Sequence, residues 1–234
     1  MVVESEENVV ESGKFLEYLS VIATVCTIGL FLTVFEICYR IKKNGSTDGI
    51  SAAPLHMGFV SGFLWFRYGL FKPDRVIVFI NGFSSGLFTF YLLFYFFYSK
   101  FERRRQQLRQ IFIELLFLST VYSYVYMSTD PFGTVLRRLG FCCMILNMAT
   151  VGSPLVALRD AIRIRSTANL PLPLSLANLV VSFEWLLYGL LVDDFFIKFP
   201  NAVAVLMSVA QLIPFLIFPR KHTPLLPKSD SVSL

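Results

Sequence analysis

Apolar residues occur along this chain in long, nearly uninterrupted blocks, unlike the alternating or one-sided patterns of soluble strands and helices. A helix needs roughly 20 apolar residues to cross about 30 Å of hydrocarbon. Seven blocks reach that length, at 17–39, 51–71, 76–98, 110–128, 135–158, 172–191 and 196–218. The pattern therefore predicts an all-α membrane protein with seven transmembrane helices.

Two stretches of the chain contain the same polar and aromatic residues at the same spacing. Residues 61–81 read SGFLWFRYGLFKPDRVIVFIN, and residues 181–201 read VSFEWLLYGLLVDDFFIKFPN. Aligning 46–81 with 166–201 without a gap gives 12 identities in 36 positions, where composition alone would give roughly 3. Chance similarity between apolar helices explains repeated Val, Phe, Leu and Ile. It does not explain Trp, Asp and Asn in register, so we infer an internal duplication.

The duplication divides the chain into two three-helix units with one helix left over. We expect an extracellular or luminal segment at 1–16, a first unit at 17–98, a basic cytosolic loop and linker helix at 99–133, a second unit at 134–218 and a disordered cytosolic tail at 219–234. A three-helix unit ends on the side opposite its start, so the extra helix returns the chain. Both units then insert the same way up, as parallel repeats in a 3+1+3 order with an inversion-linker helix.

The composition agrees with a membrane protein and the charges orient it. The chain is 55% hydrophobic and 16% charged, which is too apolar for a soluble domain. Most of its 21 Lys and Arg residues follow the first, third, fifth and seventh blocks. The positive-inside rule then places the N-terminus outside or in a lumen and the C-terminus in the cytosol. This placement of the cations also argues against nucleic acid and leaves membrane lipid as the partner.

No motif in the chain indicates catalysis, a metal or another cofactor. The four cysteines lie inside apolar blocks with no CxxC spacing, so neither a disulfide nor a zinc site is expected. There is no GxxxxGK[ST] loop for a nucleotide. We therefore expect no enzyme, no metal site and no cofactor.

Two equal halves around one axis enclose a shared site on that axis, and the repeated residues suit a neutral polyol. Asn81 and Asn201 lie about two turns inside the outer ends of their helices, and each amide can both donate and accept hydrogen bonds. Trp65 and Trp185 supply apolar faces for a sugar ring, with an indole N–H to spare. The alternatives are that the Asn residues join helices and that the Trp residues are interfacial anchors.

Further candidates flank this pair. Ser61 lies one turn inward of Trp65 on the same face, but the equivalent position in the second repeat is Val181. At the outer end, Tyr68 could close on Asp194, and Tyr188 could close equivalently on Asp74. The Asp residues could instead be solvated loop charges.

Three prolines lie near the cytosolic ends of their helices and are candidate inner hinges, because proline frees a carbonyl and permits bending. Pro54 and Pro171 also fit an ordinary helix start. Only Pro154 falls clearly inside a predicted helix. Two GxxxG pairs favour close packing within one chain over a dimer face, and a homo-oligomer stays open.

Residues 152–201 closely resemble the second repeat of the SWEET (MtN3/saliva) sugar transporter family, and GSTDGISAAPLHMGFVSGFLWFRYG resembles the first repeat. The resemblance covers about 20–218. It implies facilitative, bidirectional uniport of mono- or disaccharides by alternating access, in the plasma membrane or Golgi. The resemblance also implies roles for particular residues. Its sugar contacts fall on Asn81, Asn201, Trp65, Trp185, Ser61 and Val181. Its outer gate falls on Tyr68 and Asp194, and three of its four hinge prolines fall on Pro54, Pro154 and Pro171.

The chain departs from the family at three positions. Val34 stands where the family has its remaining hinge proline, and Arg67 and Glu184 are ionisable residues inside predicted helices. Such residues are functional candidates, so Glu184 could bind a proton or pair with Arg67. Two rival functions follow. One is a proton-coupled PQ-loop exporter of amino acids or another small metabolite, with its proton site at Glu36, Glu114 or Glu184. The other is a non-transporting cargo receptor, with Arg67 and Lys198 as cationic contacts.

Overall fold

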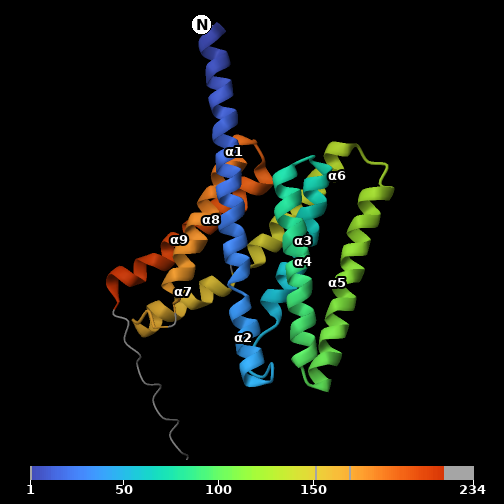
Figure 1. The fold of residues 1–234 in the computed structure, drawn as a ribbon, viewed down its shortest axis with the longest axis vertical. Coiled ribbons are helices and arrows are strands. Elements are labelled where there is room, and N and C mark those ends of the chain that lie inside the picture. Colours follow the sequence, from blue (N-terminus) through green and yellow to red (C-terminus); the bar gives the residue numbers. More distant parts are fainter. Residues whose placement is uncertain (1, 151, 169, 219–234) are drawn as a thin grey trace, which may run out of the picture.

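The computed structural model describes residues 2–150, 152–168 and 170–218, and the side chains of 11–150, 155–168 and 170–218. Every regular element in this part of the chain is a helix, which confirms the all-α prediction. The helices (Figure 1) are α1 (Val2–Leu32), α2 (Phe35–Asn44), α3 (Ala53–Phe71), α4 (Arg75–Tyr98), α5 (Phe101–Met127), α6 (Phe132–Thr150), α7 (Gly152–Ile164), α8 (Leu172–Leu191) and α9 (Phe195–Ile217).

Six helices form a closed ring around a central axis. Within the first half, α4 packs between α1 and α3; within the second half, α9 packs between α6 and α8. The ring closes through two seams between the halves, α1 against α8 and α3 against α6. The remaining long helix, α5, lies at the edge of the bundle and contacts α3 and α6 (Figure 1). This is the predicted order of two three-helix repeats joined by a linker helix.

The backbone conformation is also repeated at equivalent positions of the two halves. Gly45 and Arg165, which are 120 positions apart, both adopt a left-handed conformation after α2 and α7, with φ of 62° and 49°. Asp74 and Asp194 are the N-caps of α4 and α9, where each carboxylate accepts backbone N–H bonds of the first turn. Such capping satisfies helix donors that otherwise have no partner.

The repeated Tyr-Gly pair is explained by close helix packing. A Cβ atom on Gly69 would lie 2.9 Å from the backbone nitrogen of Val78, and one on Gly189 would lie 2.8 Å from that of Lys198. Glycine therefore lets α3 approach α4, and α8 approach α9, at equivalent points near the outer end. We use outer end for the end of the ring where α3 passes into α4, and inner end for the end where α2 passes into α3.

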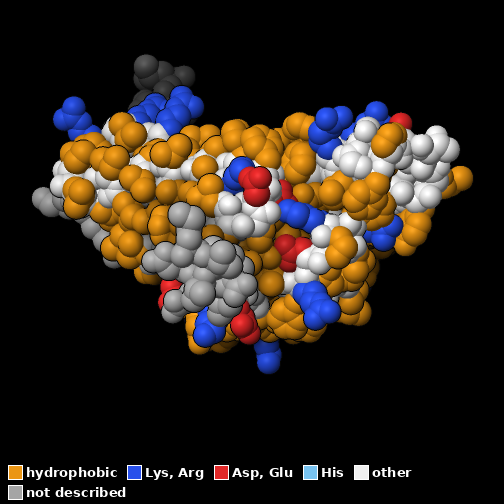
Figure 2. Space-filling view, turned by 90° about the horizontal axis from the view of Figure 1, so that it is seen from above, with side chains coloured by type: hydrophobic (Ala, Val, Ile, Leu, Met, Phe, Trp, Pro, Cys, Tyr) orange, Lys and Arg blue, Asp and Glu red, His pale blue; other side chains and the backbone are white. Residues whose placement is uncertain are grey.

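Six described stretches are long and apolar enough to cross a membrane, namely Glu11–Asn44, Arg75–Tyr98, Phe101–Met127, Phe132–Ile164, Leu172–Leu191 and Phe195–Ile217. The seventh predicted helix, α3, is absent from this set because it carries polar residues such as His56 and Arg67. It tolerates them because its neighbours enclose it: 10 of its 19 residues are buried. Around the bundle, hydrophobic side chains cover most of the rim (Figure 2), as lipid contact requires.

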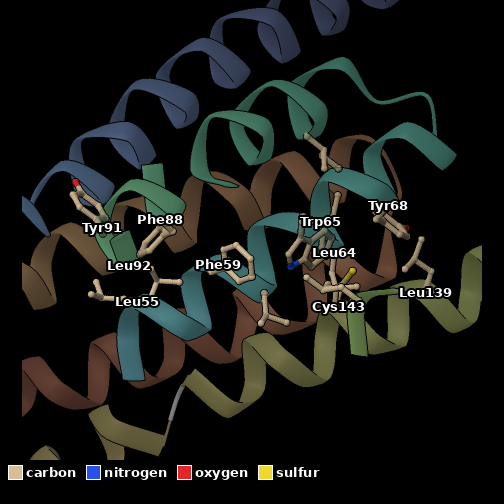
Figure 3. Close-up of a cluster of buried hydrophobic side chains, with 14 of the residues drawn as sticks. Leu55, Phe59, Leu64, Trp65, Tyr68, Phe88, Tyr91, Leu92, Leu139 and Cys143 are labelled. Atoms are coloured by element: carbon tan, nitrogen blue, oxygen red, sulfur yellow. The ribbon is translucent and has the colours of Figure 1, made fainter. Parts of the chain in front are cut away.

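The main core gathers on the enclosed helix α3. Leu64 and Tyr68 of α3 are almost fully buried, as are Leu139 and Cys143 of α6 across the seam. Figure 3 shows this group at one end of the cluster, with Phe88 of α4 towards the other. The core thus ties the two halves together through α3.

The span predicted at 17–39 falls within one candidate span, Glu11–Asn44, but its helix is interrupted at Thr33 and Val34, between α1 and α2. The backbone N–H groups of Thr33 and Val34 bond to carbonyls three residues back, at 3.1 and 3.3 Å. The Thr33 hydroxyl also donates to the Leu30 carbonyl at 2.6 Å. Such bonds tighten and bend a helix. The chain therefore bends where the family proline is missing.

The span predicted at 135–158 falls within one candidate span, Phe132–Ile164, whose described parts are α6 and α7. Pro154 lies inside this span, and its side chain lies outside the described part. One other boundary differs from prediction. The predicted basic loop after residue 99 is helical, since α5 begins at Phe101. Its Arg104 guanidinium donates to the carbonyls of Phe96 and Phe97, which satisfies the end of α4.

Candidate substrate cavity and outer closure

A cavity of about 200 Å³ lies in the middle of the ring. All six ring helices contribute to its wall, which is formed by Thr27, Phe31, Ser61, Trp65, Ile77, Ile80, Asn81, Asn147, Trp185, Ile197 and Asn201. We call it the central cavity. Five of the six residues predicted to contact the ligand meet there. The sixth, Val181, is not among the lining residues.

The two asparagines are placed equivalently. Asn81 donates one amide hydrogen to the Ile77 carbonyl at 2.9 Å, and Asn201 donates to the Ile197 carbonyl at 2.7 Å. Each bond stays within the residue's own helix, so neither asparagine joins helices, contrary to the alternative interpretation. The bond fixes the amide orientation and leaves one N–H and the carbonyl oxygen for a ligand.

The two tryptophans connect the halves across the central cavity. Trp65 donates its indole N–H to the Asn147 side-chain oxygen at 3.3 Å, and Trp185 donates to the Thr27 hydroxyl at 2.8 Å. Each bond runs from one half to the other. The expectation of a spare indole N–H is therefore wrong, and only the ring faces are free for a ligand.

Asn147 and Thr27 were not predicted as site residues. They are 120 positions apart, so they are equivalent in the two repeats, but they are not identical and the repeat alignment gave them little weight. The Ser61 hydroxyl also points to the Asn147 oxygen, at 3.5 Å. Asn147 thus organises one wall of the central cavity.

Two tyrosine–aspartate pairs close the outer end. The Tyr68 hydroxyl donates to Asp194 at 2.8 Å, and the Tyr188 hydroxyl donates to both carboxylate oxygens of Asp74 at 2.8 and 2.9 Å. Lys72 adds an ion pair to Asp194. The solvated-loop alternative is wrong for Asp194, which is only 4% exposed. We call these contacts the outer closure.

The outer closure is not symmetric. Lys72 has Val192 as its counterpart in the second repeat, so only one of the two pairs carries a cation. The neighbouring Asp193 instead binds Lys198 at 2.6 Å, and this hydrogen bond lowers the pKa of the Asp193 carboxyl.

Larger cavities lie towards the inner end. One, of about 670 Å³, shares Phe31, Ser61 and Asn81 with the central cavity and extends to Ser51 and Pro54. The central cavity therefore continues to the inner end while the outer end is closed. This is the arrangement of a carrier that is open at its inner end.

The proline positions clarify the hinge prediction. Pro54 is the second residue of α3, and Pro171 is the N-cap of α8, so both begin helices. Sequence reasoning missed Pro200 and Pro214, which lie inside α9. Pro200 is buried and directly precedes Asn201, and a proline inside a helix removes one backbone hydrogen bond.

The predicted pair between Arg67 and Glu184 is not formed. The Arg67 guanidinium lies over the rings of Tyr126, Phe71 and Tyr122, at 4.1, 5.2 and 5.7 Å from their centroids. Glu184 is 8% exposed and lies beside Cys26 of α1, and one of its carboxylate oxygens has no partner among the described residues.

Comparison with known proteins assigns this architecture. The family model described as "Sugar efflux transporter for intercellular exchange" matches residues 17–103 and 137–223, once in each repeat. The chain belongs to the SWEET (MtN3) family. It is a multi-pass membrane protein and not an enzyme.

Several SWEET proteins are similar along most of this chain. Sugar transporter SWEET1 of Caenorhabditis elegans is 35% identical over 87% of this chain, which spans 66% of that relative's length. Sugar transporter SWEET1 of Drosophila pseudoobscura is 33% identical, over 89% of this chain and 92% of its own. Bidirectional sugar transporter SWEET13 of Arabidopsis thaliana is 26% identical, over 90% and 72%.

A solved eukaryotic SWEET transporter superimposes with a TM-score of 0.79, covering 86% of this chain and 95% of its own, at 24% identity. The similarity confirms the fold predicted from the repeats.

Proposed function

We propose that this SWEET protein is a facilitative, bidirectional sugar carrier that works by alternating access. The observation that carries the proposal is the central cavity on the axis between the repeats. Both repeats supply an amide and an indole ring to it. Free amide donors and acceptors match sugar hydroxyls, and the indole faces match the C–H face of a sugar ring. The names of the related sugar transporters support the same assignment.

In the proposed cycle, the ligand binds between Asn81 and Asn201 while the outer closure is intact. Release of Tyr68 from Asp194 and of Tyr188 from Asp74 then lets the halves separate at the outer end. The ligand's hydrogen bonds stay within the cavity while access moves from one side to the other.

We propose that the inner end closes by bending at equivalent points in the two halves. In the first half the hinge would be the interruption at Thr33 and Val34, where α1 passes into α2, and in the second half it would be Pro154. Pro54 and Pro171 start the helices that move against these bends. Hinges of this kind are a few residues that absorb the change in backbone angles.

The orientation follows from the charges. We propose that the protein lies in the plasma membrane or the Golgi membrane, with its outer end facing the extracellular space or the lumen and its C-terminus in the cytosol.

Gly58 and Gly62 of one GxxxG pair pack against Phe88 and Ser85 inside the chain. This pair is therefore used for packing within the chain, and we propose sugar and membrane lipid as the partners.

A proton-coupled carrier is the second candidate, and Glu184 is the observation that favours it. A buried carboxyl oxygen without a partner is costly, and it lies at the seam between α1 and α8. The other two carboxylates named for this role fit less well: Glu36 is exposed, and Glu114 bonds to His56 at 2.9 Å.

The cargo-receptor alternative loses its support. Arg67 is enclosed by aromatic rings, and Lys198 is paired with Asp193. Neither cation is free to hold a peptide carboxylate.

Tracer sugar flux into liposomes that contain the purified protein, with and without a pH gradient, separates the three functions. We expect flux in both directions that ignores the gradient. Flux that requires the gradient, and loses that requirement in Glu184→Gln, would replace the uniporter by the coupled carrier. No flux for any sugar would contradict the sugar carrier.

A further inference from the structure

A basic pocket lies at the inner end of the bundle, on the first turns of α5, where the candidate span Phe101–Met127 begins. It is open to the surface, has a volume of about 620 Å³ and is lined by Lys100, Glu102, Arg103, Arg105, Gln106 and Arg109. Four of these six side chains are cations. The pocket shares no lining residue with the central cavity, so the proposed transport does not account for it. We call it the basic pocket.

Two cations of the basic pocket are already held by the protein. The Lys100 ammonium pairs with Asp48 of the loop between α2 and α3, at 2.6 Å. The Arg103 guanidinium donates to the Thr47 carbonyl at 2.9 Å and lies 3.4 Å from the Asp48 carboxylate. These contacts fix one wall of the pocket against the loop. A wall that is fixed in advance loses little freedom when a ligand binds.

The other two cations, Arg105 and Arg109, are not used by the protein. Both are exposed, and neither forms a hydrogen bond or an ion pair with a described residue. They are four positions apart on α5, so they share one face of the helix. Glu102, the acid in the pocket lining, also has no ion pair among the described residues. Arginine binds phosphate through paired N–H groups, so these two guanidinium groups suit an anion with about two charges.

An exposed apolar stripe borders the two free arginines. Phe101, Leu108 and Phe112 of α5 are 76%, 56% and 67% exposed. Each lies three or four positions from Arg105 or Arg109, so the stripe and the cations are neighbours on the helix surface. The stripe can contact lipid tails, because α5 forms the edge of the bundle (Figure 1). The surface therefore combines an anion site with a place for acyl chains.

We propose that the basic pocket binds a phosphoinositide of the membrane leaflet at the inner end. The phosphomonoester on the inositol ring binds between Arg105 and Arg109, and the acyl chains lie along the apolar stripe. Under the proposed orientation this is the cytosolic leaflet, whose anionic lipids attract such basic clusters. The inference does not depend on which solute the central cavity carries.

The test is a titration of the purified full chain in detergent with dioctanoyl phosphatidylinositol 4-phosphate, followed by microscale thermophoresis. The double variant Arg105→Gln/Arg109→Gln should bind this lipid about 30-fold more weakly, which is about 2 kcal/mol. It should unfold at the wild-type temperature, because neither side chain has a partner among the described residues.

A matched control removes the same charge elsewhere at the inner end. Lys42 and Lys43 are exposed residues in the last turn of α2 and lie outside the lining of the basic pocket. The double variant Lys42→Gln/Lys43→Gln should therefore keep the wild-type affinity. Phosphatidylserine, and phosphatidylinositol without the 4-phosphate, should bind the wild type at least about tenfold more weakly, which is about 1.4 kcal/mol. Soluble inositol 1,4-bisphosphate should also bind more weakly, because it has no acyl chains.

Each contrary result overturns a defined part of the proposal. Equal binding of either comparison lipid, or equal losses in the two double variants, would show a general attraction to anionic lipid and overturn the phosphoinositide site. Equal binding of the soluble bisphosphate would overturn a lipid as the occupant. Unchanged affinity in Arg105→Gln/Arg109→Gln would overturn the assignment to this pocket. The titration measures no transport, so none of these results bears on the proposed function.

Discussion

The outer closure allows a quantitative prediction. Its two tyrosine–aspartate hydrogen bonds lie at equivalent positions, but the two aspartates differ in the other partners that they keep. A hydrogen bond to a charged group contributes about 1.5–3 kcal/mol, so removing one should raise the outer-open population about 13- to 160-fold. In Tyr68→Phe, Asp194 keeps Lys72. In Tyr188→Phe, Asp74 keeps only the backbone donors of Val76 and Ile77. We therefore expect Tyr188→Phe to have the larger effect.

A native cysteine reports the opening. Cys143 is fully buried in the seam between α3 and α6, near Tyr68 (Figure 3). In a variant with the other three cysteines replaced by serine, a membrane-impermeant thiol reagent added outside should label Cys143 slowly. The labelling rate should rise with the outer-open population, most in Tyr188→Phe and less in Tyr68→Phe. Lys72→Met should also raise it, because it removes the cation paired with the buried Asp194 carboxylate.

The control is Tyr39→Phe, a change to an exposed ring far along the chain from the closure. It should leave the rate unaltered. An unaltered rate in Tyr188→Phe, at normal protein abundance, would refute the reasoning, because the outer end would then be held by something other than the tyrosine bonds.

Three further predictions test the packing, the bend and the orientation. Gly189→Ala should lower the free energy of unfolding by about 1–3 kcal/mol, because its Cβ would meet the Lys198 backbone. Gly86→Ala, which has open space around it, should leave the protein as stable as the wild type, and thermal unfolding in detergent compares the two variants. Val34→Pro should change the sugar transport rate more than the apparent affinity, because the chain already bends there; an affinity change alone would contradict this. Asn44 begins the Asn-Gly-Ser sequon and should carry no glycan, since the proposed orientation places it on the cytosolic side. An endoglycosidase-sensitive mass shift lost in Asn44→Gln would reverse the orientation.

The repeated residues could be interpreted from sequence because each has one dominant physical role. The aspartates cap helices and accept from tyrosines, the glycines permit close helix contact, and the asparagines face the axis. Identity at equivalent positions was enough to find all of them. The bend at Thr33 could not be found in this way, because hydrophobicity continues across it and a threonine hydroxyl does what proline does elsewhere.

The partners of the tryptophans were hidden for a different reason. Thr27 and Asn147 hold the indoles by different chemistry, so the alignment shows no identity between them. The two indole bonds run between helices of different halves, and the pattern along one helix does not contain such contacts.

The central claim is that Asn81 and Asn201 bind one sugar in the central cavity, and sugar flux per molecule at the membrane in Asn81→Ala and Asn201→Ala tests it most directly. Each change should remove ligand hydrogen bonds worth about 1–3 kcal/mol, about 5- to 150-fold in affinity. Abundance should stay near normal, since neither amide bonds to another helix. We predict crippled flux at normal abundance in both variants. Normal flux at normal abundance in either variant would contradict the account.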